Sequence, residues 1–199
     1  MTRAPAFAAA AATLLCACHD SREPPVVDKE LAAQMEAFEN RKRYAELTPA
    51  VLASIPDHEV ERAVFDYVLE KIGKEHAHER ELVAKLPIGA QALYITWMVD
   101  AEVRSGGFEQ YYSNRSGEFA DQAAEAFEFF SAHDHAALMR EANSVRAMDA
   151  EKRRLDKNPD GHAESQLDPL DDRFHAMKED LSALRIARIR AMPQFFSGS

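Results

Sequence analysis

Apolar residues recur along most of this chain at the three- and four-residue spacing of amphipathic helices. One such stripe ends at Gly73, a residue type that commonly terminates helices, and another begins at Pro87. Thr48 and Pro49 predict the start of a short helix, because Thr is a favoured N-cap and Pro a favoured first residue. No segment alternates apolar and polar residues for long enough to predict a strand. The pattern therefore predicts an all-α fold.

Helical patterns also occupy both ends of the folded region. Residues Lys29 to Leu47 predict one helix, with apolar residues at helical spacing: Leu31, Met35 and Phe38. Asp57 and Asp134 are expected to cap the helices that follow them. Residues Glu151 to Asp168 are charged and contain turn residues, so they predict a long loop. Leu170 to Met192 predicts a last helix, whose final turns carry cations that oppose the helix dipole: Arg185, Arg188 and Arg190.

The stretch from Met98 to Phe130 combines this periodicity with uncommon local chemistry. A helix is predicted to break at Gly106 and Gly107, which can supply positive φ or a close backbone approach. The aromatic residues that follow are expected to pack on the helical core: Phe108, Tyr111 and Tyr112. We expect Gln110 and Asn114 to hydrogen-bond backbone groups in the turn. This half of the stretch is predicted to set the fold.

A second helix is predicted after the break, with carboxylates on one face. Its four acids occupy positions i, i+3, i+7 and i+10, so they share an exposed face: Glu118, Asp121, Glu125 and Glu128. The opposite face is apolar, as an amphipathic helix requires: Phe119, Ala123, Phe127 and Phe130. The spacing is near that of phosphates along a nucleic acid strand. The acidic face is therefore a candidate surface for binding a basic partner, and an ordinary solvated surface is the alternative.

The charge balance narrows the classes of partner. The chain has 199 residues, with 34 acidic side chains against 24 Lys and Arg and a net charge of −10. Such a surface repels phosphates, which disfavours direct nucleic acid binding. It is compatible with a basic protein partner.

The first residues have the layout of a bacterial lipoprotein signal. Arg3 precedes an apolar run that is too short to span a bilayer, and small residues and cysteine follow. We predict a signal peptide over residues 1–17, lipidation of Cys18, a tether over 18–28 and a helical domain over 29–199. These features predict a protein anchored in the cell envelope through lipid and facing the periplasm or exterior. The alternative is an Ala-rich start on a cytoplasmic protein.

Catalytic patterns are missing from the sequence, so no enzyme activity and no cofactor are predicted. There is no Gly-x-Ser-x-Gly motif, no phosphate-binding glycine loop and no HExxH motif. The histidine pairs His76/His78 and His133/His135 leave a metal-dependent enzyme as a weaker alternative. Residues two apart point away from each other on a helix, so neither pair suits chelation there. No metal site is predicted.

The motif around the glycine break resembles that of the bacterial DNA-mimic-protein family, whose domain is named after DNA-mimic protein nineteen. The matching residues are Glu102, Val103, Gly106, Gly107, Phe108, Gln110, Tyr111, Tyr112, Asn114, Ser116 and Gly117. Ser105 stands where the family usually has Asn, and Tyr112 where it has Phe. The similarity covers roughly residues 60–196.

The resemblance implies an all-helical domain, a tendency to form homodimers and no known catalysis. It also implies that an acidic surface can imitate DNA and occupy the DNA-binding face of a transcription regulator, as in the namesake. Our leading hypothesis is a non-catalytic acidic binding module, tethered to the envelope, that engages a basic protein. The first alternative is a cytoplasmic DNA mimic. It excludes the lipoprotein prediction, because an exported lipoprotein would not meet a cytoplasmic regulator.

Overall fold

Residues 29–73, 78–155 and 166–198 are described by the computed structural model, with side chains omitted for 152–155. Contacts divide the chain into two units, Met1–Arg41 and Lys42–Ser199. The regular structure of the described stretches is entirely helical, and no strand occurs in them, so the all-α prediction is confirmed there. Within them no helix is long and apolar enough to cross a bilayer. The predicted signal peptide, Cys18 and the tether lie outside the described residues, and the predicted domain start at residue 29 stays a prediction.

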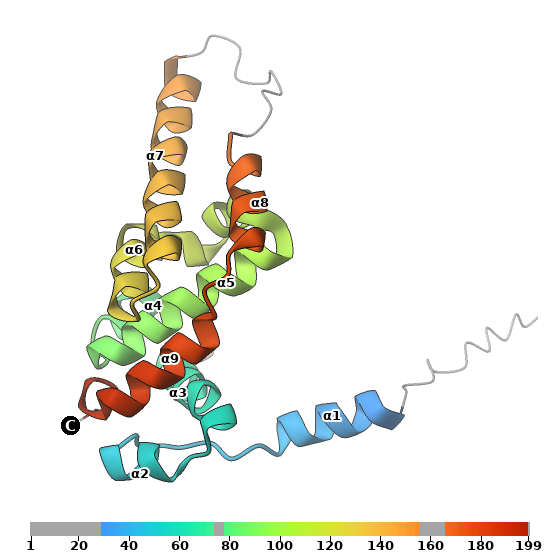
Figure 1. Ribbon diagram of the computed structural model, residues 1–199, viewed down its shortest axis with the longest axis vertical. Coiled ribbons are helices and arrows are strands. Elements are labelled where there is room, and N and C mark those ends of the chain that lie inside the picture. The colour runs from blue at the N-terminus through green and yellow to red at the C-terminus, as the bar shows by residue number, and fades with distance from the viewer. Residues whose placement is uncertain (1–28, 74–77, 156–165, 199) are drawn as a thin grey trace, which may run out of the picture. The chain divides into compact units, whose positions relative to one another are not determined.

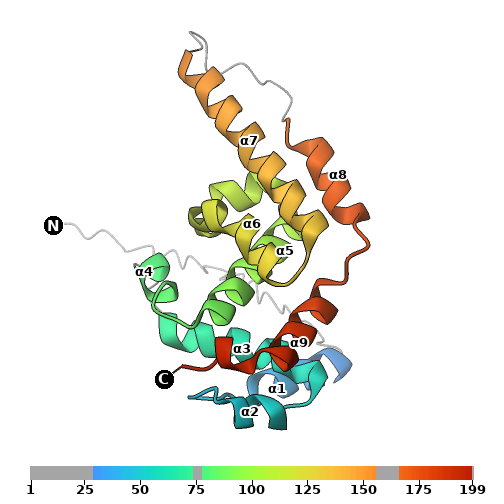
Figure 2. The ribbon, with the colours of Figure 1, turned by 60° about the vertical axis from the view of Figure 1, so that its left-hand side comes forward.

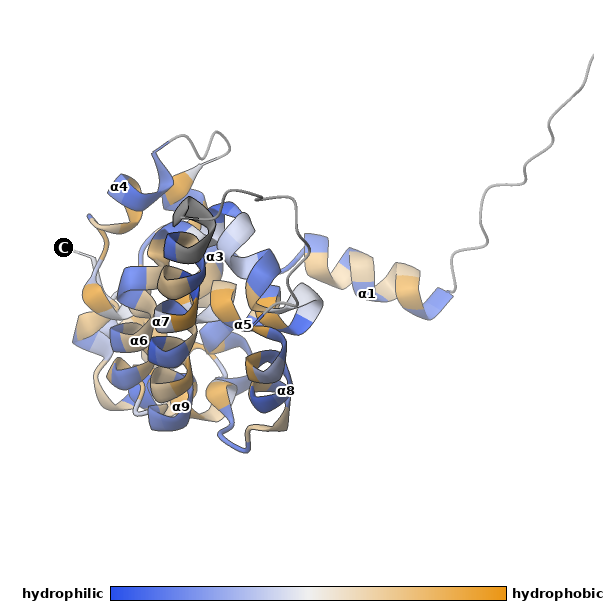
Figure 3. Ribbon diagram, turned by 90° about the horizontal axis from the view of Figure 1, so that it is seen from above, coloured by the Kyte–Doolittle hydropathy of each residue, from blue (hydrophilic) through white to orange (hydrophobic). Residues whose placement is uncertain are grey.

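Helix α1 (Lys29–Glu39) is the described helix of the first unit, and none of its residues is buried. Figure 3 shows hydrophobic residues along it, and its three large apolar side chains are about half exposed: Leu31, Met35 and Phe38. The predicted extension of this helix to Leu47 was wrong. A run of cations from Arg41 to Arg43 offers no apolar face to continue it, and Leu47 lies in the core of the second unit.

The second unit is built around one long helix. Its elements are α2 (Pro49–Ser54), α3 (Asp57–Ile72), α4 (Glu79–Val83), α5 (Ile88–Ser113), η1 (Arg115–Phe119), α6 (Ala120–Phe129), α7 (His133–Leu155), α8 (Asp168–Ala176), α9 (Leu181–Ala191) and η2 (Pro193–Phe195). Helix α5 contacts α3, η1, α6 and α8, and α6 packs along α7 (Figure 1 and Figure 2). Because α5 touches elements from both halves of the unit, its shape decides where they lie.

Large aromatic side chains fill the space around α5. Eight of them are almost completely buried: Tyr94, Phe108, Tyr111, Phe119, Phe127, Phe130, Phe174 and Phe196. Trp97, also on α5, stacks on Phe65 of α3 with 4.5 Å between ring centroids, so it packs against the core. Burial of a large apolar side chain stabilises a fold by about 1.5–3 kcal/mol, so this aromatic cluster is a main source of stability.

Two helix ends behave as their residue types predict. Thr48 caps α2, since its hydroxyl accepts a hydrogen bond from the amide of Val51 at 3.2 Å. Gly73 ends α3 with a φ of 74°, which only glycine adopts easily. Asp57, in contrast, is the first residue of α3 and Pro56 is its N-cap, so the predicted cap was one residue too late.

The start of α7 depends on a residue far away in sequence. Asp134 lies inside the first turn and does not occupy the predicted cap position. The carboxylate of Glu179 instead accepts hydrogen bonds from the backbone amides of Asp134 and His135, at 3.0 and 3.1 Å. Glu179 therefore satisfies two amides that a helix start leaves without partners.

The predicted helix from Leu170 to Met192 is two helices. Helix α8 ends at Ala176 and α9 begins at Leu181, with Asp180 as its cap accepting from the amide of Ala183 at 3.0 Å. A strong local N-cap in the middle of the apolar pattern explains the break. Because the chain turns here, α8 packs on α5 and α7, whereas α9 packs on α3.

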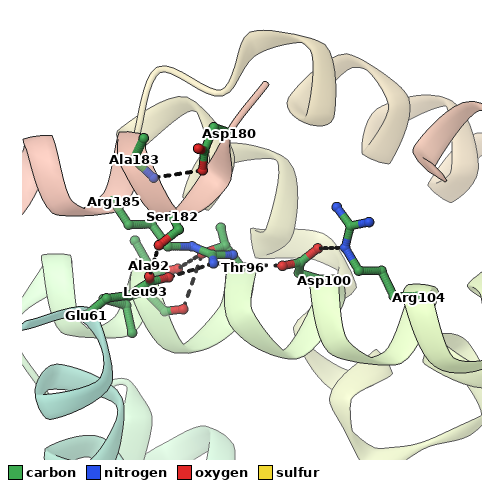
Figure 4. A network of polar contacts seen from close by, with 10 residues as sticks. All are labelled: Glu61, Ala92, Leu93, Thr96, Asp100, Arg104, Asp180, Ser182, Ala183 and Arg185. Carbon is green, nitrogen blue, oxygen red and sulfur yellow. Dashed lines mark hydrogen bonds and ion pairs between the residues drawn. The ribbon is translucent and has the colours of Figure 1, made fainter. Parts of the chain in front are cut away.

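Arg185 was predicted to stabilise a helix end and does something else. It lies within α9 and is 3% exposed, and its guanidinium bonds to Glu61 of α3 at 2.8 Å and to Thr96 of α5 at 3.1 Å (Figure 4). Ser182 also donates to Glu61, at 2.5 Å. This buried network joins three helices. Arg190, nearer the helix end, donates to the carbonyl oxygens of Leu52 and Ile55.

Candidate functional site

The predicted helix break is a kink within α5. Gly106 has φ −158° and ψ 23°, and Gly107 has φ 75° and ψ 179°, which are not helical values. The kink leaves the backbone amide of Phe108 free to donate to the carboxylate of Asp171 on α8, at 2.8 Å. The prediction that the glycine pair supplies positive φ or a close backbone approach is confirmed, with the positive φ at Gly107. The structure adds the partner that uses the released amide.

Each glycine of the motif also makes room for a neighbouring group. A Cβ on Gly106 would lie 2.1 Å from Oε1 of Gln110, and a Cβ on Gly107 would lie 2.3 Å from Oδ2 of Asp171. A Cβ on Gly117 would lie 2.9 Å from the carbonyl oxygen of Tyr111. At Gly117 the group in the way is backbone, so close approach requires glycine there. At Gly106 and Gly107 a Cβ would have to displace the end of a side chain, and at Gly107 the positive φ disfavours a side chain as well.

The polar residues of the motif meet at Glu102. Nε2 of Gln110 and Nδ2 of Asn114 both donate to Oε2 of Glu102, at 2.7 and 2.8 Å. Our expectation that these two amides bond backbone groups was wrong. The kink turns the end of α5 toward Glu102, and a carboxylate is a stronger acceptor than a backbone carbonyl. The three side chains thus form a clamp across the kink.

The aromatic residues of the motif pack as predicted. Phe108 and Tyr111 are fully buried, and Tyr112 is partly buried and donates to Oδ1 of Asn143 on α7 at 2.8 Å. Burial raises the pKa of the hydroxyl groups of Tyr111 and Tyr112, so both stay neutral. These side chains serve the fold, and no titrating role follows from them.

The clamp forms part of the wall of a cavity of about 350 Å³ between α3, α4, α5 and η1. The cavity is lined by Leu69, Glu79, Tyr94, Met98, Glu102, Asn114, Arg115 and Ser116. Its second carboxylate, that of Glu79, is 5% exposed and accepts a hydrogen bond from the hydroxyl of Tyr94 at 2.5 Å. Nε of Arg115 lies 3.7 Å from Oε2 of Glu79. Three motif residues therefore line this polar cavity: Glu102, Asn114 and Ser116.

The predicted acidic face is divided by ion pairs. Glu118 lies in η1 and not in α6, so the four acids are not on one continuous α-helix. Asp121 pairs with Arg80 of α4 at 2.6 Å, and the hydrogen bond from Arg80 lowers the pKa of Asp121. Glu128 accepts from Arg140 at 2.8 Å and lies 2.6 Å from Nδ1 of His133, and these contacts lower its pKa.

Two acids of this face form no ion pair among the described residues, although Arg80 donates to the backbone carbonyl oxygen of Glu118. Glu118 and Glu125 are both exposed, and no ion pair within the described stretches involves their carboxylates. The apolar side of the same segment is buried as predicted, at 2% exposure or less: Phe119, Ala123, Phe127 and Phe130. The segment is thus firmly seated, and its free negative charge is concentrated on two side chains.

Each described histidine of the two predicted pairs contacts a different carboxylate. His133 faces Glu128, whereas the buried His135 places Nδ1 2.6 Å from Glu179. His78 is exposed and lies 3.7 Å from Glu81, and His76 lies outside the described residues. In the described part of the chain, no three potential ligand side chains gather as a metal site would need.

Sequence reasoning did not find several of these site residues. Glu79, Arg80 and Asp171 contact Tyr94, Asp121 and Phe108 from 15 to 63 positions away in the chain, and no local pattern marks them. Arg115 lies inside the motif, between Asn114 and Ser116, and its position there was the one available signal. Long-range packing brings the other partners to the site.

Comparison of the sequence with known protein families shows which part of this site is shared with a family. The family described as DMP19-like protein matches residues 84–192, more than half of the 199-residue chain. The chain belongs to the DMP19-like protein family. The match includes the kink, the clamp, η1 and α6, whereas Leu69, Glu79 and Arg80 lie before it. Searches of curated proteins and of solved structures found no match.

Proposed function

We propose that this DMP19-like protein is a non-catalytic binding protein whose acidic surface engages a basic protein partner. Membership of the family and a net charge of −10 support this class of function. Opposite charge on two surfaces speeds their encounter and restricts the choice of partner. The proposal concerns binding alone and involves no cofactor.

The observation that carries the proposal is the contrast among the four predicted contact residues. Asp121 and Glu128 are engaged by cations of the same chain, at 2.6 and 2.8 Å. Glu118 and Glu125 are exposed and keep their charge available to solvent. A partner's lysine or arginine gains most from a carboxylate that forms no ion pair within its own chain. We therefore centre the partner-binding surface on Glu118 and Glu125.

DNA mimicry is a second candidate, and the family match favours it. A DNA mimic places carboxylates on a rigid support so that a DNA-binding protein accepts them in place of phosphates. The buried side chains of Phe119 and Phe127 provide such a support beneath Glu118 and Glu125. In this version the partner is a DNA-binding protein, and the chain blocks its DNA-binding face.

The location of the protein separates the two versions. Lipidation of Cys18 would place the chain at the envelope, where a cytoplasmic regulator is out of reach. Feeding cells radiolabelled fatty acid should label the wild-type protein and leave Cys18→Ala unlabelled. Label that persists in Cys18→Ala, or wild-type protein found in the cytosol, would exclude the anchored version and favour the cytoplasmic mimic.

The binding surface itself is tested by charge reversal. The full chain, immobilised, is used to capture basic proteins, and each captured protein is then purified and titrated against the wild type. Glu118→Lys/Glu125→Lys should weaken binding at least tenfold, with the greatest loss at low salt. The matched control is Glu46→Lys/Glu70→Lys, which reverses two exposed carboxylates outside η1 and α6 and changes the net charge equally. Equal effects of both double variants would mean that only net charge matters and would contradict the proposal.

A duplex competition experiment then distinguishes DNA mimicry. If the captured protein binds DNA, increasing concentrations of duplex should displace it from the wild-type chain. Capture that is insensitive to duplex would leave the acidic binding function in place and exclude mimicry.

A further inference from the structure

A second cavity, of about 610 Å³, lies between the end of α3, the start of α5 and the residues that follow α9. It is lined by Tyr67, Lys71, Lys85, Leu86, Pro87, Ile88, Gln194, Phe195, Ser197 and Gly198. Most of these residues lie outside the family match over residues 84–192, and none belongs to η1 or α6. Neither the family nor the acidic surface therefore accounts for the cavity.

The cavity is locally basic in an acidic protein. Two of its lining residues are cations, Lys71 and Lys85, and no described lining residue is a carboxylate. Both lysines are exposed, and neither forms an ion pair with any residue that the structure describes. Nζ of Lys71 lies over the ring of Tyr67, 5.1 Å from its centroid, and this contact favours a position at the cavity wall. Charges of the chain farther than about 8 Å away are largely screened at physiological salt, so distant acids weaken this local positive charge little.

A nearly buried hydroxyl group without a protein partner also opens into the cavity. Tyr67 is 6% exposed, and its hydroxyl makes no hydrogen bond within the described stretches. A Cβ on Gly198, another lining residue, would lie 2.9 Å from this hydroxyl oxygen, which places the oxygen at the cavity surface. A hydroxyl in such a position loses hydrogen-bond energy unless a molecule in the cavity supplies an acceptor. It is a donor directed at a ligand.

The positive end of a long helix lies at the same wall. Helix α5 begins at Ile88, directly after Pro87, and no side chain caps it. Both residues line the cavity. Because the first amides of a helix lack intrahelical partners and carry the positive end of its dipole, they favour an anion there. The helix start, the lysines and the tyrosine hydroxyl thus all favour a negatively charged ligand.

The apolar part of the wall and the number of donors narrow the class of anion. Ile88 is 54% exposed and Phe195 is 40% exposed, which is uncommon for large apolar side chains of the second unit. They offer a surface to an apolar group. A phosphate monoester carries a charge of about −1.5 to −2 and three acceptor oxygens, which matches two lysines and one hydroxyl donor. A carboxylate, with one charge, would leave one of the two lysines without a counter-charge.

We propose that this cavity binds a small phosphate monoester whose organic part is apolar. Lys71, Lys85 and the hydroxyl of Tyr67 hold the phosphate group. The organic part lies against Ile88 and Phe195. The proposal goes beyond the binding of a basic protein, since it concerns a ligand of the opposite charge and residues outside η1 and α6. It involves binding alone, and no bond is made or broken.

The test titrates the full chain with phenyl phosphate in an isothermal titration calorimeter. Phenyl phosphate should bind in a saturable way, with one molecule per chain. Inorganic phosphate lacks the apolar part and benzoate lacks the second negative charge, so each should bind at least tenfold more weakly. Absence of binding by phenyl phosphate, or equal affinity for either comparison compound, would overturn the proposal.

Tyr67→Phe separates ligand binding from folding. The substitution removes a hydroxyl that has no hydrogen-bond partner among the described residues, so the melting temperature should hardly change. The affinity for phenyl phosphate should fall several-fold, because the phosphate loses a donor. An unchanged affinity in this variant would contradict the proposal.

The two lysines are tested against a lysine elsewhere on the surface. Lys71→Gln and Lys85→Gln should each weaken phenyl phosphate several-fold, and the double variant should abolish saturable binding. The matched control is Lys178→Gln, which removes an exposed lysine between α8 and α9, changes the net charge equally and should leave the affinity unchanged. Equal effects of Lys85→Gln and Lys178→Gln would mean that only net charge matters, and the proposal would fail.

Discussion

The backbone amide of Phe108 donates a hydrogen bond of 2.8 Å to Asp171, sixty-three positions further along the chain. The amide is available because Gly106 and Gly107 depart from helical geometry. The bond ties the kink of α5 to α8, and it makes two kinds of substitution informative.

Removing the acceptor at Asp171 tests this bond. Asp171→Ala leaves a partly buried amide without a partner and should lower the free energy of unfolding by about 1–3 kcal/mol. Asp171→Asn keeps an oxygen acceptor and should cost much less. Burial raises the pKa of Asp171 in the folded protein above that in the unfolded chain. The contribution of this carboxyl group to stability therefore falls as the pH rises from the unfolded pKa through the folded one. Urea denaturation at neutral pH measures the difference, and equal losses in both variants would show that the bond contributes nothing.

The two glycines with positive φ form a matched pair. Gly73 (φ 74°, ψ −167°) and Gly107 (φ 75°, ψ 179°) share one backbone conformation. A Cβ on Gly73 meets nothing within 4 Å, whereas one on Gly107 meets Asp171 at 2.3 Å. Gly73→Ala should cost about 1–3 kcal/mol from backbone strain. Gly107→Ala should cost distinctly more, and Gly107→Val should destabilise the unit broadly. Thermal melting checks this, and an unchanged melting temperature for Gly107→Val would refute it.

The buried pair of Glu61 and Arg185 should be sensitive to loss of one member. Arg185→Met leaves the carboxylate of Glu61 buried without its cation, which should cost about 3–5 kcal/mol. The double variant Glu61→Leu/Arg185→Met should lose clearly less than the sum of the single variants. The control is Arg173→Met, which breaks an exposed pair with Glu141 and should cost at most about 1 kcal/mol. Additive losses in chemical denaturation would show that the pair is not coupled.

Glu179 should make stability depend on acid pH. Burial raises its pKa, but hydrogen bonds from His135 and from the amides of Asp134 and His135 outweigh burial, so the net effect lowers the pKa below 4.5. A lowered carboxyl pKa contributes stability above the unfolded pKa, and that contribution is lost as the pH falls through the folded one. Wild type should therefore lose more stability than Glu179→Gln as the pH falls below 4.5. Parallel stability curves for the two proteins would contradict this assignment.

The acidic segment shows which features a local sequence pattern can predict and which it cannot. The spacing of Phe119, Ala123 and Phe127 correctly predicts which side is buried, because one helical periodicity decides that. The same spacing predicts four equivalent carboxylates, but in the structure two of them form ion pairs within the chain and two do not. Arg80, forty-one positions before Asp121, neutralises one of them. A pattern within ten residues contains no information about a cation so far away.

In the glycine motif, too, the sequence predicts the backbone and the packing but not the side-chain partners. Its sequence predicts the break in α5, the positive φ of Gly107 and the packing of the aromatic residues, because glycine and aromatic side chains have strong intrinsic preferences. The partners of Gln110 and Asn114 were predicted wrongly, since side-chain amides accept many geometries. The cavity beside them was not predicted, because Glu79 reaches it from another helix.

The sequence by itself determined the helical class, the break at Gly106 and Gly107, the cap at Thr48 and the buried side of η1 and α6. Those features depend on backbone preference and on the periodicity of a helix, which act over a few neighbouring residues. Only the tertiary structure decided that Glu102 closes the kink, that Arg80 neutralises Asp121, and that Glu118 and Glu125 keep their charge exposed. Those outcomes depend on which helices pack together, because a charge can be neutralised only by a group that the fold brings within a few ångströms of it.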